Sequence, residues 1–424
     1  MMNFKKTIWI ALIGCLSFTF TAVAEEPFRP VEGEFPPIEK AHSYRGELIF
    51  VDHATRRASI RVQSTGMFRR NNPHPIAMLP YGMISYHGAP AALRDIPLGT
   101  IMHVKGYLPP DPKISSVPLF PINNKNIDGN HYRGVGTEPA ENYVLLLEDE
   151  PSYCKRNGLV WKLKELEYKG SEWLIKAIRV PKNGEDPKAK EETFTFDAST
   201  RIWRGRELLS VEDIVAEKLW PGSGKKSLND QQVLIGLNFK PTPEGIFTRF
   251  HITDVWLDDT AAQRAAQKQT EVHKAFMRSR WIPAYVDKVE YGKFGRATVT
   301  ATLFGGMDES IYSDFKKEMG VTVNAAELTL KHSAGGYGPS HIASKGKILE
   351  VTKAAGDIPM GSSGIQIRFE TDLIIEGIRK SRVVRIRPHS WPDLKLPREE
   401  CVWDHNFTHE DRFPTPAIFP KYSP

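Results

Sequence analysis

The sequence contains few cysteines. Of its 424 residues only three are cysteine, and beyond the apolar N-terminal stretch that holds Cys15 just Cys154 and Cys401 remain. So few cysteines exclude a small scaffold held together by several disulfides, and stability must therefore come from apolar cores. Two alternatives stay open for this pair. Cys154 and Cys401 form a disulfide in an oxidising compartment, or they are two separate buried thiols.

Long runs of one charge are absent as well. Lys and Arg outnumber Asp and Glu by 57 to 51, and no run of five like charges occurs. Nucleic-acid binding requires basic side chains clustered on one face or along one element. We therefore expect no nucleic acid among the partners of this protein.

A third absence concerns apolar runs. Beyond residue 24, no run approaches the ~20 apolar residues of a membrane-spanning helix, which predicts no transmembrane segment in the mature chain. Residues 1–24 have the pattern of a secretory signal peptide, with Lys5-Lys6, an apolar core at 8–20 and Ala22-Val23-Ala24. We expect export to the periplasm or the extracellular space. An alternative interpretation takes residues 12–15 as a lipobox, with a lipid anchor on Cys15, although the residues that follow stay apolar.

One short motif is repeated in the chain. Asp95-Ile96-Pro97-Leu98-Gly99 returns with one change as Asp357-Ile358-Pro359-Met360-Gly361, and a shorter copy begins with Asp213-Ile214. Alternating apolar and polar residues with turn signals surround the copies in a similar order. Repetition of this kind predicts a tandem array of similar units, which indicates an architecture and not an activity.

The array divides into three β-rich units. Each unit begins with a predicted hairpin and offers roughly five or six short strands, which is typical of a small antiparallel barrel. The predicted fold is mainly β, with three tandem small barrels, one linking helix and one short inserted helix. The predicted boundaries are a signal peptide at 1–24, a Pro-rich leader at 25–44, barrels at 45–150, 151–257 and 282–388, a linking helix at 258–281, an insertion at 305–338 and a Pro-rich C-terminal arm at 389–424.

Two segments have helical patterns. Asp258-Asp259-Thr260 is a cluster of N-cap residues, and the helix formers after it place Ala265, Val272 and Phe276 on one side of the linking helix. Its other faces are polar, so we expect this helix to bridge the second and third units rather than to lie in a core. The shorter inserted helix is predicted at 309–319.

The hairpin-first units and the repeated motif resemble exported bacterial proteins built from tandem OB-like β-barrel repeats. In that pattern, Asp between two hydrophobic residues and a later Gly mark the loop before a late barrel strand. The first unit matches at Asp95 and Gly99 and the third at Asp357 and Gly361, whereas the second has Glu217 where the Gly belongs. The resemblance implies three OB-like barrels, and it carries over no catalytic residue.

The motif also has a direct physical interpretation. An Asp in a turn accepts hydrogen bonds from nearby backbone N–H groups, and a Gly supplies a positive φ angle. We therefore interpret Asp95, Asp213 and Asp357, together with Gly99 and Gly361, as turn-forming residues rather than ligand contacts.

The C-terminal segment 401–411 holds a candidate metal site. Cys401, His405 and His409 are residue types that bind transition metals, and the two histidines are four residues apart. The segment lacks the His-Glu-x-x-His pattern and a second nearby cysteine, so the alternative is a solvated polar tail. Apart from this divalent metal, no cofactor is predicted.

Aromatic residues suggest where a ligand would bind. OB-like barrels often bind extended polymers with aromatic side chains as stacking platforms, and outside the cell the available polymer is polysaccharide. Most of the tryptophans are expected in barrel cores. Trp220, next to the basic loop 222–227, and Tyr337, in the Gly-rich segment 335–341, are the candidate ligand-binding residues.

Two functions remain in competition. The first is an exported, non-enzymatic binding or assembly protein of the bacterial cell envelope, with polysaccharide or envelope proteins as partners. The second is a carbohydrate-active hydrolase with its site at the insertion of the third unit or at a seam between units. No catalytic residue is identified, because no Gly-x-Ser-x-Gly elbow or paired-carboxylate signature is visible.

Overall fold

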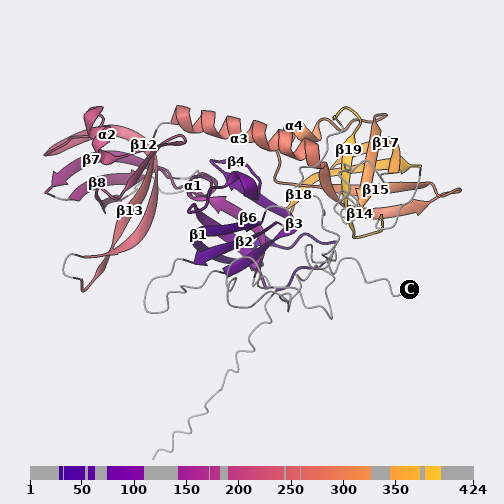
Figure 1. Cartoon of the computed structure of the whole chain (residues 1–424), viewed down its shortest axis with the longest axis horizontal. Helices are drawn as coiled ribbons and strands as arrows, with labels where there is room; N and C mark the ends of the chain where they lie inside the picture. Colours follow the sequence, from indigo (N-terminus) through magenta and orange to yellow (C-terminus); the bar gives the residue numbers. More distant parts are fainter. Residues whose placement is uncertain are drawn as a thin grey trace, which may run out of the picture.

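The structure is a computed structural model that contains three small closed β-barrels and few helices (Figure 1). It describes residues 28–31, 33–52, 56–62, 74–108, 142–170, 172–181, 190–242, 245–257, 259–325, 344–372 and 378–392. The predicted fold class is confirmed. Within these residues, no helix is both long and apolar enough to cross a bilayer.

The first barrel is closed by five strands. Around the barrel their order is β1, β2, β3, β6, β5 and back to β1, and β3 pairs with β6 in parallel. The elements are η1 (Ile38–Lys40), β1 (His42–Asp52), β2 (Arg57–Val62), β3 (His74–Tyr86), β4 (Ala89–Pro90), η2 (Leu93–Asp95), β5 (Ile101–Tyr107) and β6 (Asn142–Asp149). The sequence predicted antiparallel pairs only. β3 and β6 run in the same direction because the chain first forms β5, which is antiparallel to β6, before β6 returns beside β3.

The second barrel has the same order of strands. β7, β8, β9, β13 and β12 follow one another, and β13 runs parallel to both β9 and β10. Helix α1 (Glu150–Asn157) connects the first barrel to it, and its own elements are β7 (Trp161–Lys169), β8 (Glu172–Arg179), β9 (Glu191–Phe196), β10 (Arg201–Arg204), β11 (Glu207–Leu209), α2 (Val211–Ala216), β12 (Lys225–Pro241) and β13 (Thr248–Leu257). Helix α2 precedes the fourth barrel strand, as η2 does in the first barrel.

The third barrel has a different topology. Its six strands are ordered β14, β15, β18, β17, β16 and β19, and every neighbouring pair is antiparallel. They are β14 (Ile282–Tyr291), β15 (Ala297–Phe304), β16 (Gly320–Ala325), β17 (Ser344–Lys353), β18 (Ser362–Thr371) and β19 (Val383–Pro388), with α4 (Glu309–Tyr312) after β15. The repeated motif therefore occupies different places: the copy at Asp95 precedes β5, and the copy at Asp357 joins β17 to β18. The third unit is a barrel, but it is not a copy of the first.

Helix α3 (Asp259–Arg280) links the second and third barrels. Figure 1 shows it running from the second barrel across the first barrel, which lies in the middle, to the third. Its buried residues include Ala265, Gln269 and His273, whereas Val272 is exposed. Of the predicted apolar side, Ala265 is buried and Phe276 is partly buried, whereas the placement of Val272 was wrong, because the helix buries the polar residues Gln269 and His273 instead.

The Pro-rich leader packs against the body of the molecule. Each barrel has its own apolar core, and a further cluster at the junction of the first and third barrels includes Tyr81, Tyr285 and Phe304. The ring of Phe35 from the leader lies 5.2 Å from that of Tyr81 and 5.5 Å from that of Tyr285, between ring centroids. The leader thus covers a seam between two barrels.

The sequence did not predict two of the helices. Asp149 caps α1 by accepting a hydrogen bond from the N–H of Ser152, and Ser210 caps α2 through the N–H of Asp213. Such short helices leave little periodic signal in the sequence. The inserted helix is also shorter than predicted, since α4 ends at Tyr312.

Candidate functional site

A groove of about 470 Å³ lies between the first and second barrels. Strands β10 and β13 of the second barrel form one wall. The other wall is formed by the segment 97–101 and the N-terminus of α1, both from the first barrel. The groove is therefore at a seam between units, one of the two places at which the hydrolase hypothesis put its site.

Two tryptophans lie side by side on the wall formed by the second barrel. Trp203 on β10 and Trp256 on β13 are direct partners in the parallel pairing of these strands. Their neighbours Ile202 and Val255 are fully buried in the barrel core. Because side chains alternate along a strand, both tryptophans are on the outer face and line the groove while remaining partly exposed.

An ion pair holds one ring of this aromatic pair, that of Trp203. Asp254 accepts a hydrogen bond of 2.8 Å from the indole N–H of Trp203, and its carboxylate is 2.8 Å from Nε of Arg201. Asp254 is buried, whereas Arg201 is partly exposed. This hydrogen bond restricts the rotation of the Trp203 ring, so the ring is held in place before a ligand binds.

The opposite wall contributes carboxylates that already have polar partners. The carboxylate of Asp149 accepts hydrogen bonds from the N–H groups of His87 and Ser152, at 2.8 and 3.0 Å. Burial raises the pKa of Asp149 to about 6 despite these bonds. Glu150 next to it is 2.9 Å from Nε of Arg45 and 3.0 Å from Nε2 of His103.

His87 adds a neutral polar group to this wall. Burial, with help from the charges of Arg206 and Lys155, lowers the pKa of His87 to about 4, so its imidazole is uncharged at neutral pH. The groove therefore offers two partly exposed indoles, a neutral imidazole and ion-paired groups. This is a surface for binding a polar ligand that has flat apolar faces.

Of the predicted ligand contacts, only Trp220 lies in the described residues. Its side chain is 2% exposed and packs in the core of the second barrel, with its ring centroid 5.4 Å from that of Phe196. A stacking platform needs an exposed face, and Trp220 offers none. Tyr337 lies outside the described residues, as do the predicted metal ligands Cys401, His405 and His409.

Cys154 is buried on α1, and burial raises the pKa of its thiol to about 12. Its proposed disulfide partner, Cys401, lies outside the described residues, so the pairing stays a prediction. Over the parts of the chain that the structure describes, no group of three or more His, Cys, Asp or Glu side chains is arranged to hold a metal ion.

The repeated motif residues lie in turns with distinct contacts. Asp95 accepts a hydrogen bond of 2.9 Å from the N–H of Ala92, and Asp213 accepts one of 2.8 Å from the N–H of Ser210. Gly99 and Gly361 have φ angles of +90° and +95°. Asp357 is exposed.

Asp95 also docks the linking helix. Its carboxylate accepts a hydrogen bond of 3.0 Å from Nε2 of Gln269 on α3. The carbonyl oxygen of the same Gln269 side chain accepts a hydrogen bond of 2.8 Å from Arg206, which lies in the β10–β11 turn of the second barrel. One glutamine therefore joins the helix to both barrels that form the groove.

Trp203 and Trp256 were not predicted from the sequence as site residues. A signal was present, because each tryptophan follows a core residue in an alternating strand, in Arg201-Ile202-Trp203 and Asp254-Val255-Trp256. Their pairing was not predictable, since it depends on β10 returning beside β13 in parallel.

Compared with protein-family models and with curated proteins, the chain matches none of them. The geometry of the groove is therefore the basis for a functional argument.

Proposed function

We propose that this protein is an exported, non-enzymatic glycan-binding protein of the bacterial cell envelope, and that it binds its ligand in the groove between the first and second barrels. The observation that supports the proposal is the pair of partly exposed indoles of Trp203 and Trp256, side by side on adjacent strands. The secretory pattern of residues 1–24 favours a partner outside the cytoplasm.

The groups around the indoles suit a sugar. A pyranose ring has flat C–H faces that pack on aromatic rings, and hydroxyl groups at its rim that need donors and acceptors. The Arg201–Asp254 pair supplies both at the edge of the platform. The indoles lie on neighbouring strands, which are about 4.8 Å apart, so together they span roughly one sugar ring.

A hydrolase is the second candidate, and one observation favours it. Asp149 lines the groove, and burial raises the pKa of its carboxyl group to about 6, into the range of a general acid. However, its two oxygens accept hydrogen bonds from the N–H groups of His87 and Ser152. The bond from Ser152 makes Asp149 the N-cap residue of α1. We therefore assign it a structural role.

The test is a glycan panel assayed with the mature protein by thermal unfolding and by titration calorimetry. A glycan that binds only the folded state raises the midpoint. We expect Trp256→Ala to weaken binding at least about tenfold, because aromatic anchors dominate such sites. Tyr291→Ala is the matched control, since Tyr291 is an exposed aromatic residue outside the groove.

The same samples distinguish the two candidates. A binding protein leaves the glycan intact, whereas a hydrolase releases new reducing ends during incubation. Loss of such a product in Asp149→Asn would establish the hydrolase and refute our proposal. Equal affinity of wild type and Trp256→Ala for the glycan would show that the groove is not the binding site.

A further inference from the structure

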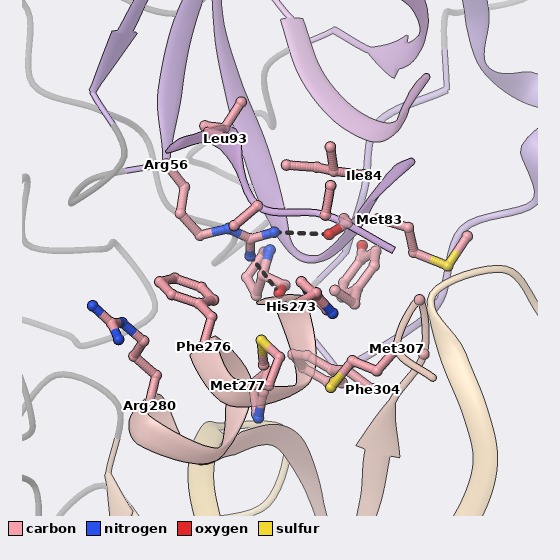
Figure 2. A pocket seen from close by; sticks show the side chains of 18 of the residues that line it. Arg56, Met83, Ile84, Leu93, His273, Phe276, Met277, Arg280, Phe304 and Met307 are labelled. Carbon is pink, nitrogen blue, oxygen red and sulfur yellow. Dashed lines mark hydrogen bonds between the residues drawn. The ribbon is translucent and has the colours of Figure 1, made fainter. Parts of the chain in front are cut away.

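A second hollow lies where the first barrel, α3 and the third barrel meet. It is a cavity of about 120 Å³, distinct from the groove. Figure 2 shows Arg56 entering from the first barrel and Phe276, Met277, Phe304 and Met307 on the side of α3 and the third barrel. An engineered apolar cavity of about 150 Å³ holds a benzene molecule, so this space suits a ligand of similar or slightly smaller size.

The described lining of the cavity is positively charged. Arg56, Arg280 and Arg385 belong to it, and none of its described members is Asp or Glu. The guanidinium of Arg56 donates hydrogen bonds to the backbone carbonyls of Leu79, Pro80 and Gly82, at 3.1, 2.7 and 2.7 Å. These acceptors hold the group in place, but they are neutral and do not cancel its charge.

Two effects disfavour the positive charge of Arg56. Burial, together with repulsion from Arg385, lowers the pKa of Arg56 to about 10. A positive charge that is held against desolvation and against a like charge is stabilised by an incoming anion. Guanidinium has five N–H donors, and among the described residues Arg56 finds acceptors for three of them.

His273 provides a polar group that lacks a partner. Its side chain is 4% exposed, and its Nδ1 is buried with no hydrogen-bond partner among the described residues. Burial is the main reason that the pKa of His273 falls to about 4; Arg56 and Arg94 lower it, while Asp95 and Asp308 act in the opposite direction. Buried polar atoms are nearly always satisfied, so the lack of a partner among the described residues supports a bound molecule at this position.

We propose that this cavity binds a short-chain monocarboxylate with an apolar body of about three carbons, so that the whole ligand is no larger than benzene. The carboxylate accepts hydrogen bonds from the remaining N–H groups of Arg56 and from the imidazole of His273. The apolar body packs against Phe276, Met277 and Met307. Methionines suit this task because their flexible side chains adapt to the shape of a ligand.

The cavity shares no lining residue with the proposed glycan groove, although both adjoin β3 and η2 of the first barrel. Its lining includes the C-terminal part of α3, and the same helix carries Gln269, which bonds two residues of the groove lining, Asp95 and Arg206. Occupancy would therefore stabilise the junction of the first and third barrels, where the leader packs.

The experiment titrates the mature protein with three probes: butyrate, 1-butanol and inorganic phosphate. We expect butyrate to bind with one-to-one stoichiometry, raise the unfolding midpoint, and bind at least about tenfold more tightly than 1-butanol. Phosphate should cause no shift. Equal binding of 1-butanol would show an apolar cavity only, and a response to phosphate but not to butyrate would show an inorganic-anion site; either result overturns the proposal.

Two further measurements locate the bound probe. His273→Leu has a side chain of similar volume without a polar atom and should abolish butyrate binding, while Arg296→Gln, which changes an exposed arginine outside the cavity lining, should leave it unchanged. If His273→Leu does not fold, crystals of the wild type with butyrate still decide the matter. Difference electron density for butyrate in the cavity supports the proposal, and density only elsewhere contradicts it.

Discussion

At the scale of single residues, the two glycines of the repeated motif have the same backbone geometry and different surroundings. A Cβ atom on Gly361 would lie 2.8 Å from Cδ2 of Tyr81, at the junction of two barrels, whereas a Cβ on Gly99 would meet nothing within 4 Å. Both glycines have φ near +90°. Both glycines therefore have a backbone conformation that other residues disfavour, and only Gly361 also has a close neighbour.

The two alanine variants separate these effects. Gly99→Ala should destabilise the protein by about 1 kcal/mol, the cost of a positive φ. Gly361→Ala should cost about 1–3 kcal/mol more, because Tyr81 or the backbone must shift to make room. Chemical denaturation measures both free energies of unfolding. Equal losses of stability in the two variants would mean that Tyr81 moves aside without a cost in free energy.

His273 predicts a pH dependence of stability. The pKa of His273 is about 4 in the folded protein against an ordinary value of 6.5, so the unfolded chain takes up a proton first as the pH falls. The folded state therefore loses stability between pH 6.5 and 4. His87 acts in the same direction, and Asp149, whose folded pKa is raised to about 6, acts in the opposite one.

His273→Gln isolates one of these contributions. Between pH 7 and pH 5 this variant should lose about 2 kcal/mol less stability than the wild type, since one pKa unit corresponds to about 1.4 kcal/mol. The measurement is urea unfolding at a series of pH values. Parallel curves for the two proteins would show that His273 is protonated with an ordinary pKa in the folded state.

At the scale of elements, the side chain of Gln269 joins α3 to the first and second barrels. With 22 residues it spans about 33 Å, enough to cross the first barrel and reach the third. Gln269 bonds both Asp95 and Arg206. Replacing Gln269 by Ala leaves both groups without this partner and should cost about 1–3 kcal/mol.

Gln267→Ala is the matched control on the same helix, because Gln267 is exposed. It should be neutral or slightly stabilising, since Ala is the better helix former. Denaturation midpoints of the two variants give the comparison. A loss of the same size in both would indicate helix propensity, and not the Gln269 contacts, as the cause.

Prediction from the sequence succeeded where the pattern was local. The hairpins and the linking helix follow from alternation, turn residues and an N-cap cluster. It failed where distant segments decide the outcome. The parallel β3–β6 pair, the different order of the third barrel and the pairing of Trp203 with Trp256 each depend on which strands meet. The burial of Gln269 and His273 on α3 was not predicted, because both side chains are polar.

At the scale of the whole molecule, the first barrel sits between the other two (Figure 1). Residues of the first barrel line both hollows. The leader closes the junction with the third barrel, where the ring of Phe35 lies within 6 Å, between centroids, of Tyr81, Tyr285 and Phe304. Phe35→Ala should therefore cost about 2–3 kcal/mol. Glu39→Ala, an exposed change in the same leader, should be close to neutral in the same denaturation experiment.

The central claim concerns the groove between the first and second barrels. Its most direct test is calorimetric titration of wild type, Trp203→Phe and Trp256→Ala with the glycan that the panel identifies, alongside their unfolding midpoints. We predict at least about tenfold weaker binding for Trp256→Ala and a smaller loss for Trp203→Phe, which keeps a ring, with all three proteins folded. Unchanged affinity in folded Trp256→Ala would contradict the account.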